Sequence, residues 1–416
     1  MSETLDVRIG RYLRELTSHP DRHVGAPGNH AATAMFAERI AGFGFDVART
    51  RFDCIEWKYG EAVLEMDGER FELLVGPYSL PFDGRAALVG VSCVEELESE
   101  AIRGCIVVLH GSIAAGQIMP RNFTFYNPES HRRIIRALDA YAPVAVIAAT
   151  GRDPEMVGSQ YPFPLFEDGD LDVPNAYMTD IEGERLLAHA GSIASLRIDS
   201  RRVPTTAEHV VATLQGDAPG RIVVFAHIDS RKGSPGALDN ASGVATLLGL
   251  AELLADYTHG PTIEIVPLNG EDNYANPGEM LWVGANEDRM DDIILGINID
   301  DAGMRGQDTH VSFYSCDDRL EAAVRQAMGG RVGISEGLKW FQSDHAIFGI
   351  YGRPAIALAS ADIAGFMAKY AHSERDTIEL ADPGILANAA RFLRDVIDAI
   401  ATGASNPSAV DPATTA

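Results

Sequence analysis

The chain has 416 residues, of which 46% are hydrophobic, and its formal net charge at pH 7 is −26. A chain of this length and composition can bury a large core and divides most readily into two domains. An acidic surface repels polyanions and phosphate contacts need clustered Lys and Arg, so this composition argues against a nucleic-acid partner. No apolar run reaches the length of a signal-peptide core or of a membrane helix, so we expect a cytoplasmic protein that does not bind membranes.

The chain opens with helical periodicity. Residues 5–18 and 30–43 are predicted to be helices because their apolar residues fall at helical spacing, and Gly42 lies where the second helix ends. A strand is predicted to follow at 45–52.

Between about residues 61 and 202 the sequence changes to short strands with frequent turns. Strands are predicted at 62–66, 71–74, 86–90, 105–109, 142–149, 175–178 and 193–198, with one helix near 130–141. This unit separates the helical opening from a second regular region. We therefore interpret 61–202 as an inserted domain, and 1–60 with 203–402 as one catalytic unit.

From Glu208 onward, apolar strands alternate with helices, which is typical of βαβ units and a largely parallel sheet. Strands are predicted at 210–214, 222–226, 262–268, 293–299, 310–314 and 355–359, and helices at 241–255, 277–289, 317–327, 343–348 and 383–401. The predicted fold class is α/β, with a mostly parallel mixed sheet flanked by helices and an inserted mainly-β domain. Residues 403–416 have little to bury and are predicted to be a disordered tail.

The stretch from 221 to 243 contains the first candidate functional residues. A buried apolar strand ends at His227, and Asp239 lies at the mouth of the next loop, immediately before an apolar helix. Ligands of open α/β sheets bind at the carboxyl ends of the strands. We therefore expect His227 and Asp239 to hold a metal ion.

Three more candidate ligands occupy equivalent places. Asp272 and Asp300 follow two later strands, and His372 lies in a loop before the last helix. If the sheet is parallel, these side chains converge with His227 and Asp239 at one edge. Two imidazoles and three carboxylates suit a pair of zinc ions, with Asp239 as the natural bridge.

Two further residues receive roles that a ligand cannot fill. Glu271 is placed to accept a proton from a water molecule and to pass it to a leaving amine. Asp229 is placed to accept the second ring N–H of His227. The alternative interpretation is structural, since strand-end histidines are often hydrogen-bonded core residues and acidic pairs usually face solvent. Several such groups closing buried strands favour metal, because an unpaired buried charge is costly.

Six blocks then appear in a recognisable order: His227-x-Asp229, Asp239-Asn240-x-Ser242-Gly243, Asn269-Gly270-Glu271-Asp272, Asn298-Ile299-Asp300, Ser343-Asp344-His345, and His372 with Asp376-Thr377. This order resembles that of the di-zinc exopeptidases of metallopeptidase family 28. The resemblance implies a zinc-exopeptidase fold, of the phosphorylase/hydrolase-like type, with Glu271 as general base. The ligand sets it implies are His227, Asp239 and Asp300 for one zinc, and Asp239, Asp272 and His372 for the other. The insert resembles the protease-associated domain of some members.

The chain departs from the family pattern at two positions. Asp272 stands where the family usually has Glu, and Ala371 stands where a tyrosine commonly precedes the last histidine. Tyr370, one position earlier, is the remaining candidate for oxyanion stabilisation. Ser343-Asp344-His345 opens a predicted helix, in which Ser343 is expected to be the N-cap and Asp344 to complement the helix dipole. Alternatively, Asp344 or His345 supports the wall of a substrate pocket.

The resulting functional hypothesis is a zinc-dependent hydrolase that removes the N-terminal residue from a peptide or dipeptide. An amidohydrolase acting on N-acyl amino acids or other amides is the second interpretation. A glutaminyl-cyclase-like transferase and a metal-free binding protein are further alternatives. The expected partner is a peptide or small amide substrate, and the sequence leaves open whether the chain forms a homo-oligomer.

Overall fold

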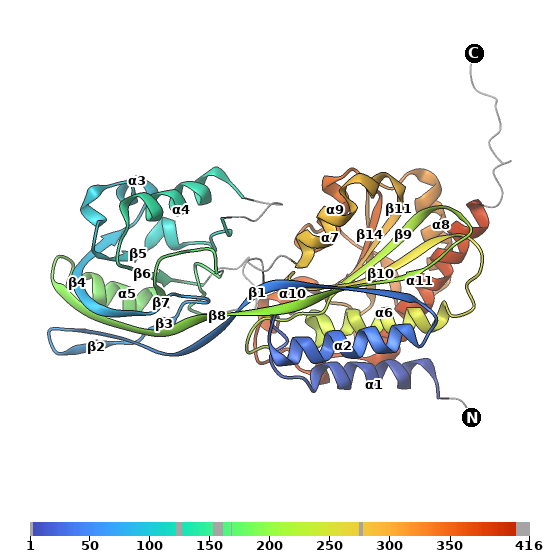
Figure 1. Ribbon diagram of the computed structural model, residues 1–416, viewed down its shortest axis with the longest axis horizontal. Helices are drawn as coiled ribbons and strands as arrows, with labels where there is room; N and C mark the ends of the chain where they lie inside the picture. Colours follow the sequence, from blue (N-terminus) through green and yellow to red (C-terminus); the bar gives the residue numbers. More distant parts are fainter. Residues whose placement is uncertain (1–2, 122–126, 153–160, 168, 274–277, 405–416) are drawn as a thin grey trace, which may run out of the picture.

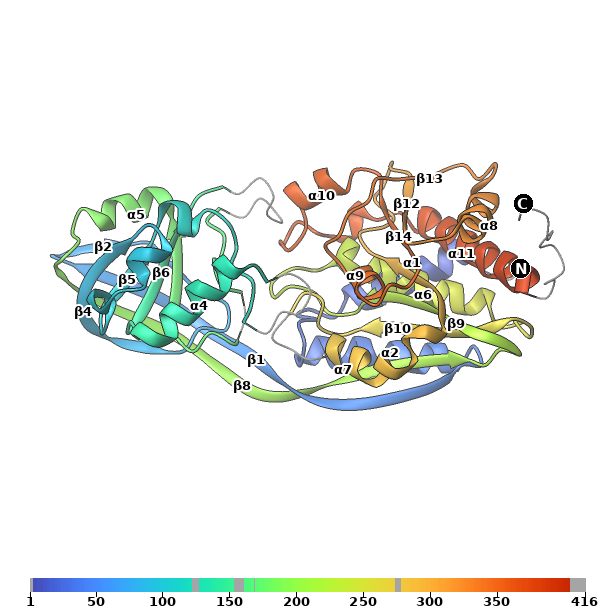
Figure 2. The ribbon, with the colours of Figure 1, turned by 90° about the horizontal axis from the view of Figure 1, so that it is seen from above.

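Two long strands run side by side along the molecule and join its two units (Figures 1 and 2). They are β1 (Asp46–Met66) and β8 (Ile193–Leu214), paired antiparallel with one register shift between Tyr59 and Ala62. The short strands predicted at 45–52, 62–66, 193–198 and 210–214 are therefore the ends of two continuous strands. Sequence periodicity misses the middle of this ribbon because much of it is polar and solvent-exposed.

The computed structural model describes residues 3–121, 127–152, 161–167, 169–273 and 278–404. The larger unit contains a mixed sheet in the order β13-β12-β14-β11-β9-β10-β8. Its strands are β9 (Ala218–His227), β10 (Pro261–Leu268), β11 (Ile293–Ile299), β12 (Thr309–Tyr314), β13 (Ile334–Glu336) and β14 (Ala355–Ser360). The central strands β10, β9, β11 and β14 are parallel, while β8 is antiparallel to β10 and β12 is antiparallel to β14 but parallel to β13. The predicted mixed, mostly parallel sheet is confirmed.

Helices cover both faces of this sheet (Figure 1). They are α1 (Leu5–Thr17), α2 (Pro27–Ala41), α6 (Ser242–Leu253), α7 (Gly278–Asn286), α8 (Asp318–Met328), α9 (His345–Ile350), α10 (Ile363–Lys369) and α11 (Pro383–Ala404). The strand β9 shows the division of the core, because Ile222 and Val224 pack toward α1, α6 and α11, whereas Val223 and Phe225 pack toward α7 and α9. A strand buried on both faces is a continuous apolar run, which is why the sequence identified it.

The smaller unit extends the same sheet through β8 and β4. Its strands are β2 (Glu69–Phe71), β3 (Leu74–Val75), β4 (Phe82–Val91), β5 (Ile106–Leu109), β6 (Ala145–Thr150) and β7 (Asn175–Thr179), and its helices are α3 (Val94–Leu97), α4 (Glu129–Tyr141) and α5 (Asp180–Leu187). Strands β4, β5, β6 and β7 are parallel. The insert contains α3 and α5 in addition to the one helix predicted near 130–141, because parallel neighbours need crossover connections.

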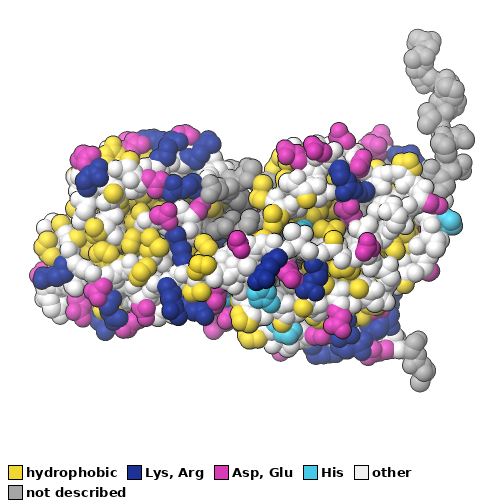
Figure 3. All heavy atoms as spheres, in the orientation of Figure 1, with side chains coloured by type: hydrophobic (Ala, Val, Ile, Leu, Met, Phe, Trp, Pro, Cys, Tyr) yellow, Lys and Arg dark blue, Asp and Glu magenta, His cyan; other side chains and the backbone are white. Residues whose placement is uncertain are grey.

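The end of the chain differs slightly from the prediction. The last helix, α11, continues to Ala404, so the predicted tail at 403–416 begins two residues too early, and its remaining residues lie outside those described. Among the described residues, no helix combines the length and apolar character that crossing a membrane requires. Figure 3 shows acidic and basic side chains interspersed over the visible face, with apolar side chains gathered on the smaller unit.

Candidate metal centre

His227 lies at the carboxyl end of the buried strand β9. Its neighbour Ile228 still donates a backbone hydrogen bond to Leu268 of β10 (2.7 Å), after which the chain leaves the sheet. The ring atom Nδ1 lies 3.2 Å from the main-chain oxygen of Asp229 and 3.8 Å from its carboxylate. The ring is therefore fixed at Nδ1, with Nε2 directed away from the strand.

Asp239 lies in the irregular turn that leads into α6. The turn is held by Asp376, whose two carboxylate oxygens accept hydrogen bonds from the backbone N–H groups of Leu238 (2.9 Å) and Asp239 (3.0 Å). Asn240 completes the turn, since its side chain donates to the main chain of Ile299 (2.8 Å). Asp376 thus positions Asp239 through the backbone.

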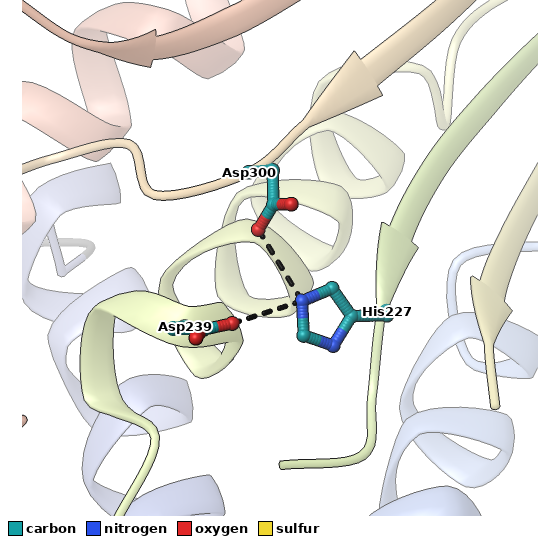
Figure 4. Close-up of side chains that lie close together, drawn as sticks. All are labelled: His227, Asp239 and Asp300. Atoms are coloured by element: carbon teal, nitrogen blue, oxygen red, sulfur yellow. Dashed lines mark ion pairs between the residues drawn. The ribbon is translucent and has the colours of Figure 1, made fainter. Parts of the chain in front are cut away.

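The first ligand group joins three buried residues from three elements (Figure 4). His227 Nε2 lies 3.1 Å from Asp239 Oδ1 and 3.3 Å from Asp300 Oδ1. Asp300 follows β11, whose end is held when its backbone N–H donates to Leu358 of β14 (3.0 Å). The parallel sheet therefore brings these residues together at one edge, as the sequence predicted.

The second ligand group shares Asp239. His372 Nε2 lies 3.2 Å from Asp239 Oδ2 and 2.8 Å from Asp272 Oδ1. His372 adopts the left-handed backbone conformation, with φ of 56°, which is uncommon outside glycine and is concentrated at functional sites. The shorter side chain of Asp272 reaches this group, so the departure from the family's usual Glu leaves the group complete.

The charges of the nearby carboxylates act on the two histidines. Burial alone would lower the pKa of His227, but the charges of Asp300 and Asp239 outweigh it and raise that pKa well above its usual value. Burial also opposes the charged form of His372, yet Asp272 and Asp239 raise its pKa to about 10. In the absence of a cation, the histidines thus act as the counter-charges of the carboxylates.

The chemistry of the donors fits zinc. Each group offers one imidazole nitrogen and two carboxylate oxygens, the nitrogen and oxygen ligands that Zn²⁺ takes in catalytic sites. His227 Nε2, Asp300 Oδ1 and Asp272 Oδ2 are buried and make no hydrogen bond with described residues. Buried polar atoms without hydrogen bonds are rare, and two of these, His227 Nε2 and Asp300 Oδ1, lie 3.3 Å apart in the first group. His227, Asp239 and Asp300 would hold one ion, and Asp239, Asp272 and His372 the other.

Glu271 lies beside the ligand groups without belonging to either. Burial raises its pKa well above the usual value, and the charges of Asp272 and Asp300 act in the same direction. The loop that carries Glu271 is fixed by Asp229, whose carboxylate accepts hydrogen bonds from Gly270 N (2.8 Å), Asp272 N (3.1 Å) and Asn273 Nδ2 (2.8 Å). Asp229 therefore orients this loop as well as lying near the His227 ring.

The structure adds a supporting residue that the sequence interpretation assigned to helix capping. Ser343 Oγ donates to Asp300 Oδ2 (2.6 Å) and accepts from Asn298 Nδ2 (2.8 Å). The N-terminal cap of α9 is Asp344. This role depends on the short distance between Ser343 and Asp300, which the sequence alone does not reveal.

The three residues considered for substrate or oxyanion contacts are placed differently. His345 packs between Tyr314 and Trp340, and its Nε2 lies 2.8 Å from the main-chain oxygen of Trp340, so its contacts are those of a buried packing residue. Both carboxylate oxygens of Asp344 are buried without a hydrogen bond to described residues. The ring of Tyr370 stacks on Phe366 and packs against the apolar core. Its role in stabilising an oxyanion stays a prediction.

A cavity of about 810 Å³ opens beside the second ligand group. His372, Asn273 and Arg231 line it from the larger unit, and aromatic residues such as Trp57 and Tyr177 line it from the ribbon and the insert. A volume of this size accommodates a small peptide or amide. The insert therefore forms one wall of the cleft that leads to the candidate metal centre.

Two polar contacts cross this cleft and end at the metal centre. Glu167 of the insert forms an ion pair with Arg231, whose Nε lies 3.4 Å from His372 Nδ1. Tyr78 donates to Asn273 Oδ1 (3.0 Å), and Asn273 in turn contacts Asp229. Neither contact was predicted, because the partners are far apart in sequence.

The mixed, mostly parallel sheet flanked by helices places the molecule in the α/β class of folds. Residues 209–397 match the family model described as peptidase family M28.

Individual relatives agree with this match. The probable lipoprotein aminopeptidase LpqL of Mycobacterium tuberculosis is 24% identical over 291 residues, which is 67% of this chain and 54% of LpqL, so the chain matches about half the length of that relative. The solved aminopeptidase from Aneurinibacillus sp. strain AM-1 has a TM-score of 0.73 at 21% identity, covering 94% of this chain and 93% of its own. BSAP, a zinc aminopeptidase from Bacillus subtilis, has a TM-score of 0.69 at 18% identity, covering 94% of each chain. These structural likenesses show the fold.

Proposed function

We propose that this protein is a two-zinc aminopeptidase, which removes the N-terminal residue from a peptide or dipeptide. One observation carries the proposal: two ligand groups share Asp239, while Glu271 lies beside them without joining either. This is the arrangement that a hydrolase needs, with cations to activate a water molecule and a separate carboxylate to move its proton. The aminopeptidases of the same fold support the substrate class.

The roles of the side chains follow from their positions. When bound, the two cations supply Lewis-acid chemistry, polarising a carbonyl and making water more acidic. Glu271 accepts the proton of the attacking water and delivers it to the nitrogen of the leaving amine. Asp229 holds the Glu271 loop through three hydrogen bonds, and Ser343 keeps Asp300 oriented.

We also propose that the insert is a domain of the protease-associated type that closes one side of the substrate cleft. Its parallel strands β4–β7 and its contribution to the 810 Å³ cavity support this. A cytoplasmic location is proposed too, supported by four cysteines that form no disulfide, and cell fractionation with an antibody to the protein tests it.

Paired substrates test the activity. The zinc-loaded protein is expected to hydrolyse leucyl-p-nitroanilide and to leave its N-acetyl derivative intact, because an aminopeptidase requires the free amine. Hydrolysis of N-acyl amino acids instead would favour the amidohydrolase interpretation. Absence of bound zinc together with absence of turnover on both substrates would exclude both.

A further inference from the structure

The second ligand group has a cation as its neighbour. Arg231 Nε lies 3.4 Å from His372 Nδ1 and 3.9 Å from Asp272 Oδ1. The Arg231 side chain is only 12% exposed, so solvent screens its charge weakly. In the described part of the chain, no arginine forms an ion pair with His227, Asp239 or Asp300, the first ligand group.

This neighbour conflicts with metal binding in two ways. A histidine that binds a metal through Nε2 carries its hydrogen on Nδ1, and that N–H normally donates to a carboxylate or carbonyl. Arg231 presents N–H donors and has no acceptor, so two donors would face each other at Nδ1. Its positive charge also repels a cation held by His372 and Asp272.

The insert supplies the counter-charge. Glu167 forms an ion pair with Arg231 Nη2, and the Glu167 side chain is 9% exposed. A carboxylate on the far side of the guanidinium neutralises part of its charge and draws it toward the insert. The charge of Glu167 therefore reaches the second ligand group through a single residue, Arg231.

We infer that Arg231 weakens cation binding at the Asp239, Asp272 and His372 group, and that Glu167 of the insert limits this weakening. The inference rests on the proposed two-zinc function. It makes the second ion the more weakly held of the two and makes its occupancy dependent on the insert. Arg231 and Glu167 act here as positioning residues, since neither belongs to a ligand group.

Titration of the metal-free full-length protein with Zn²⁺ by calorimetry tests the inference. In Arg231→Gln the weaker site is expected to bind about tenfold more tightly, because the charge is lost and the amide offers an acceptor to Nδ1. In Glu167→Gln the same site is expected to bind about tenfold more weakly, and in both variants the tighter site stays unchanged. Arg231→Lys, which keeps the charge, is expected to retain a weak second site.

A double-mutant cycle tests whether Glu167 changes Zn²⁺ affinity through Arg231 or through some other effect of the insert. Glu167→Gln is expected to have no effect on Zn²⁺ affinity when Arg231 is already Gln, because its effect passes through the guanidinium. Asp172→Asn is the matched control, since Asp172 lies near Glu167 in sequence but pairs with Arg202 (2.9 Å) and is 76% exposed. It is expected to leave both affinities unchanged, and circular dichroism confirms that each variant is folded.

The outcomes are distinguishable. Two Zn²⁺ affinities that do not respond to Arg231→Gln, or a Glu167→Gln effect that persists without Arg231, overturn the inference and leave the proposed function standing. A wild-type protein that binds no Zn²⁺ overturns both.

Discussion

Tyr78 of the insert donates a hydrogen bond to Asn273 of the larger unit, with 3.0 Å between Tyr78 Oη and Asn273 Oδ1. The other side of the Asn273 amide donates to Asp229, which holds the loop carrying Glu271. Asn273 and Asp229 thus link an insert residue to the loop that bears the proposed general base.

Removing the Tyr78 hydroxyl should destabilise the protein. Tyr78→Phe leaves the buried Asn273 oxygen without this donor, and we expect the free energy of unfolding in urea to fall by about 1 kcal/mol. Tyr59→Phe is the control, since Tyr59 is 53% exposed, and it should change stability little. Equal stability of the two variants would show that the Tyr78 contact contributes nothing.

Glu271→Gln should abolish proton transfer while leaving the ligand groups intact. We expect kcat for leucyl-p-nitroanilide to fall by about a thousandfold, with zinc content unchanged, because general base catalysis of this kind contributes about 10²- to 10⁴-fold. Glu287→Gln, at an exposed position, should keep full activity. A Glu271 variant with normal kcat would place the base elsewhere.

The shared ligand predicts an asymmetry in metal content. Asp239→Asn removes a donor from both groups and should leave less than about one zinc ion per chain, whereas Asp300→Asn should lower the content from about two to about one. Metal analysis after dialysis measures both. If the Asp239 and Asp300 variants lose the same amount, Asp239 does not bridge.

Asp376 should affect metal binding without touching a metal. Asp376→Asn replaces one of the two acceptors for the backbone of Leu238 and Asp239 with a donor, so the turn that presents Asp239 is misplaced. We expect zinc affinity to fall by about 10- to 100-fold, the usual range for supporting residues. Glu379→Gln, three residues later and exposed, serves as the control in the same titration.

His209 should make stability depend on pH. Burial lowers its pKa to about 4, and neither ring nitrogen makes a hydrogen bond with described residues. Since the folded pKa lies below the ordinary value of about 6.5, the stabilisation is complete above pH 6.5 and is lost as the pH falls toward 4, by about 2 kcal/mol at pH 5. The difference in unfolding free energy between pH 7.5 and pH 5 should therefore shrink in His209→Leu. The exposed variant His259→Gln should retain it.

Much of the metal centre was predictable because a parallel sheet converts sequence order into spatial proximity. His227, Asp272 and Asp300 each follow an apolar strand, and parallel strands end at one edge. The same logic identified the sheet, because strands buried on both faces appear as uninterrupted apolar runs.

The contacts that cross between the two units were not predictable. Glu167 and Arg231 are separated by 64 residues and Tyr78 and Asn273 by 195, and no periodicity links such pairs. The helix α10 was missed as well, because it is only seven residues long and has one fully buried side chain, Phe366. Its apolar pattern is too short to establish a period.

The extra residue of β1 between Tyr59 and Ala62 sets the orientation of everything beyond it. Because successive side chains of a strand point to opposite sides, deleting one residue there would turn Leu64 and Met66, now buried, outward into water. The smaller unit could then keep its own core only if β1 shifted its register against β8. That shift would move Glu167 and Tyr78 away from Arg231 and Asn273, the residues that they contact. This β-bulge therefore sets the orientation of the smaller unit relative to the larger one.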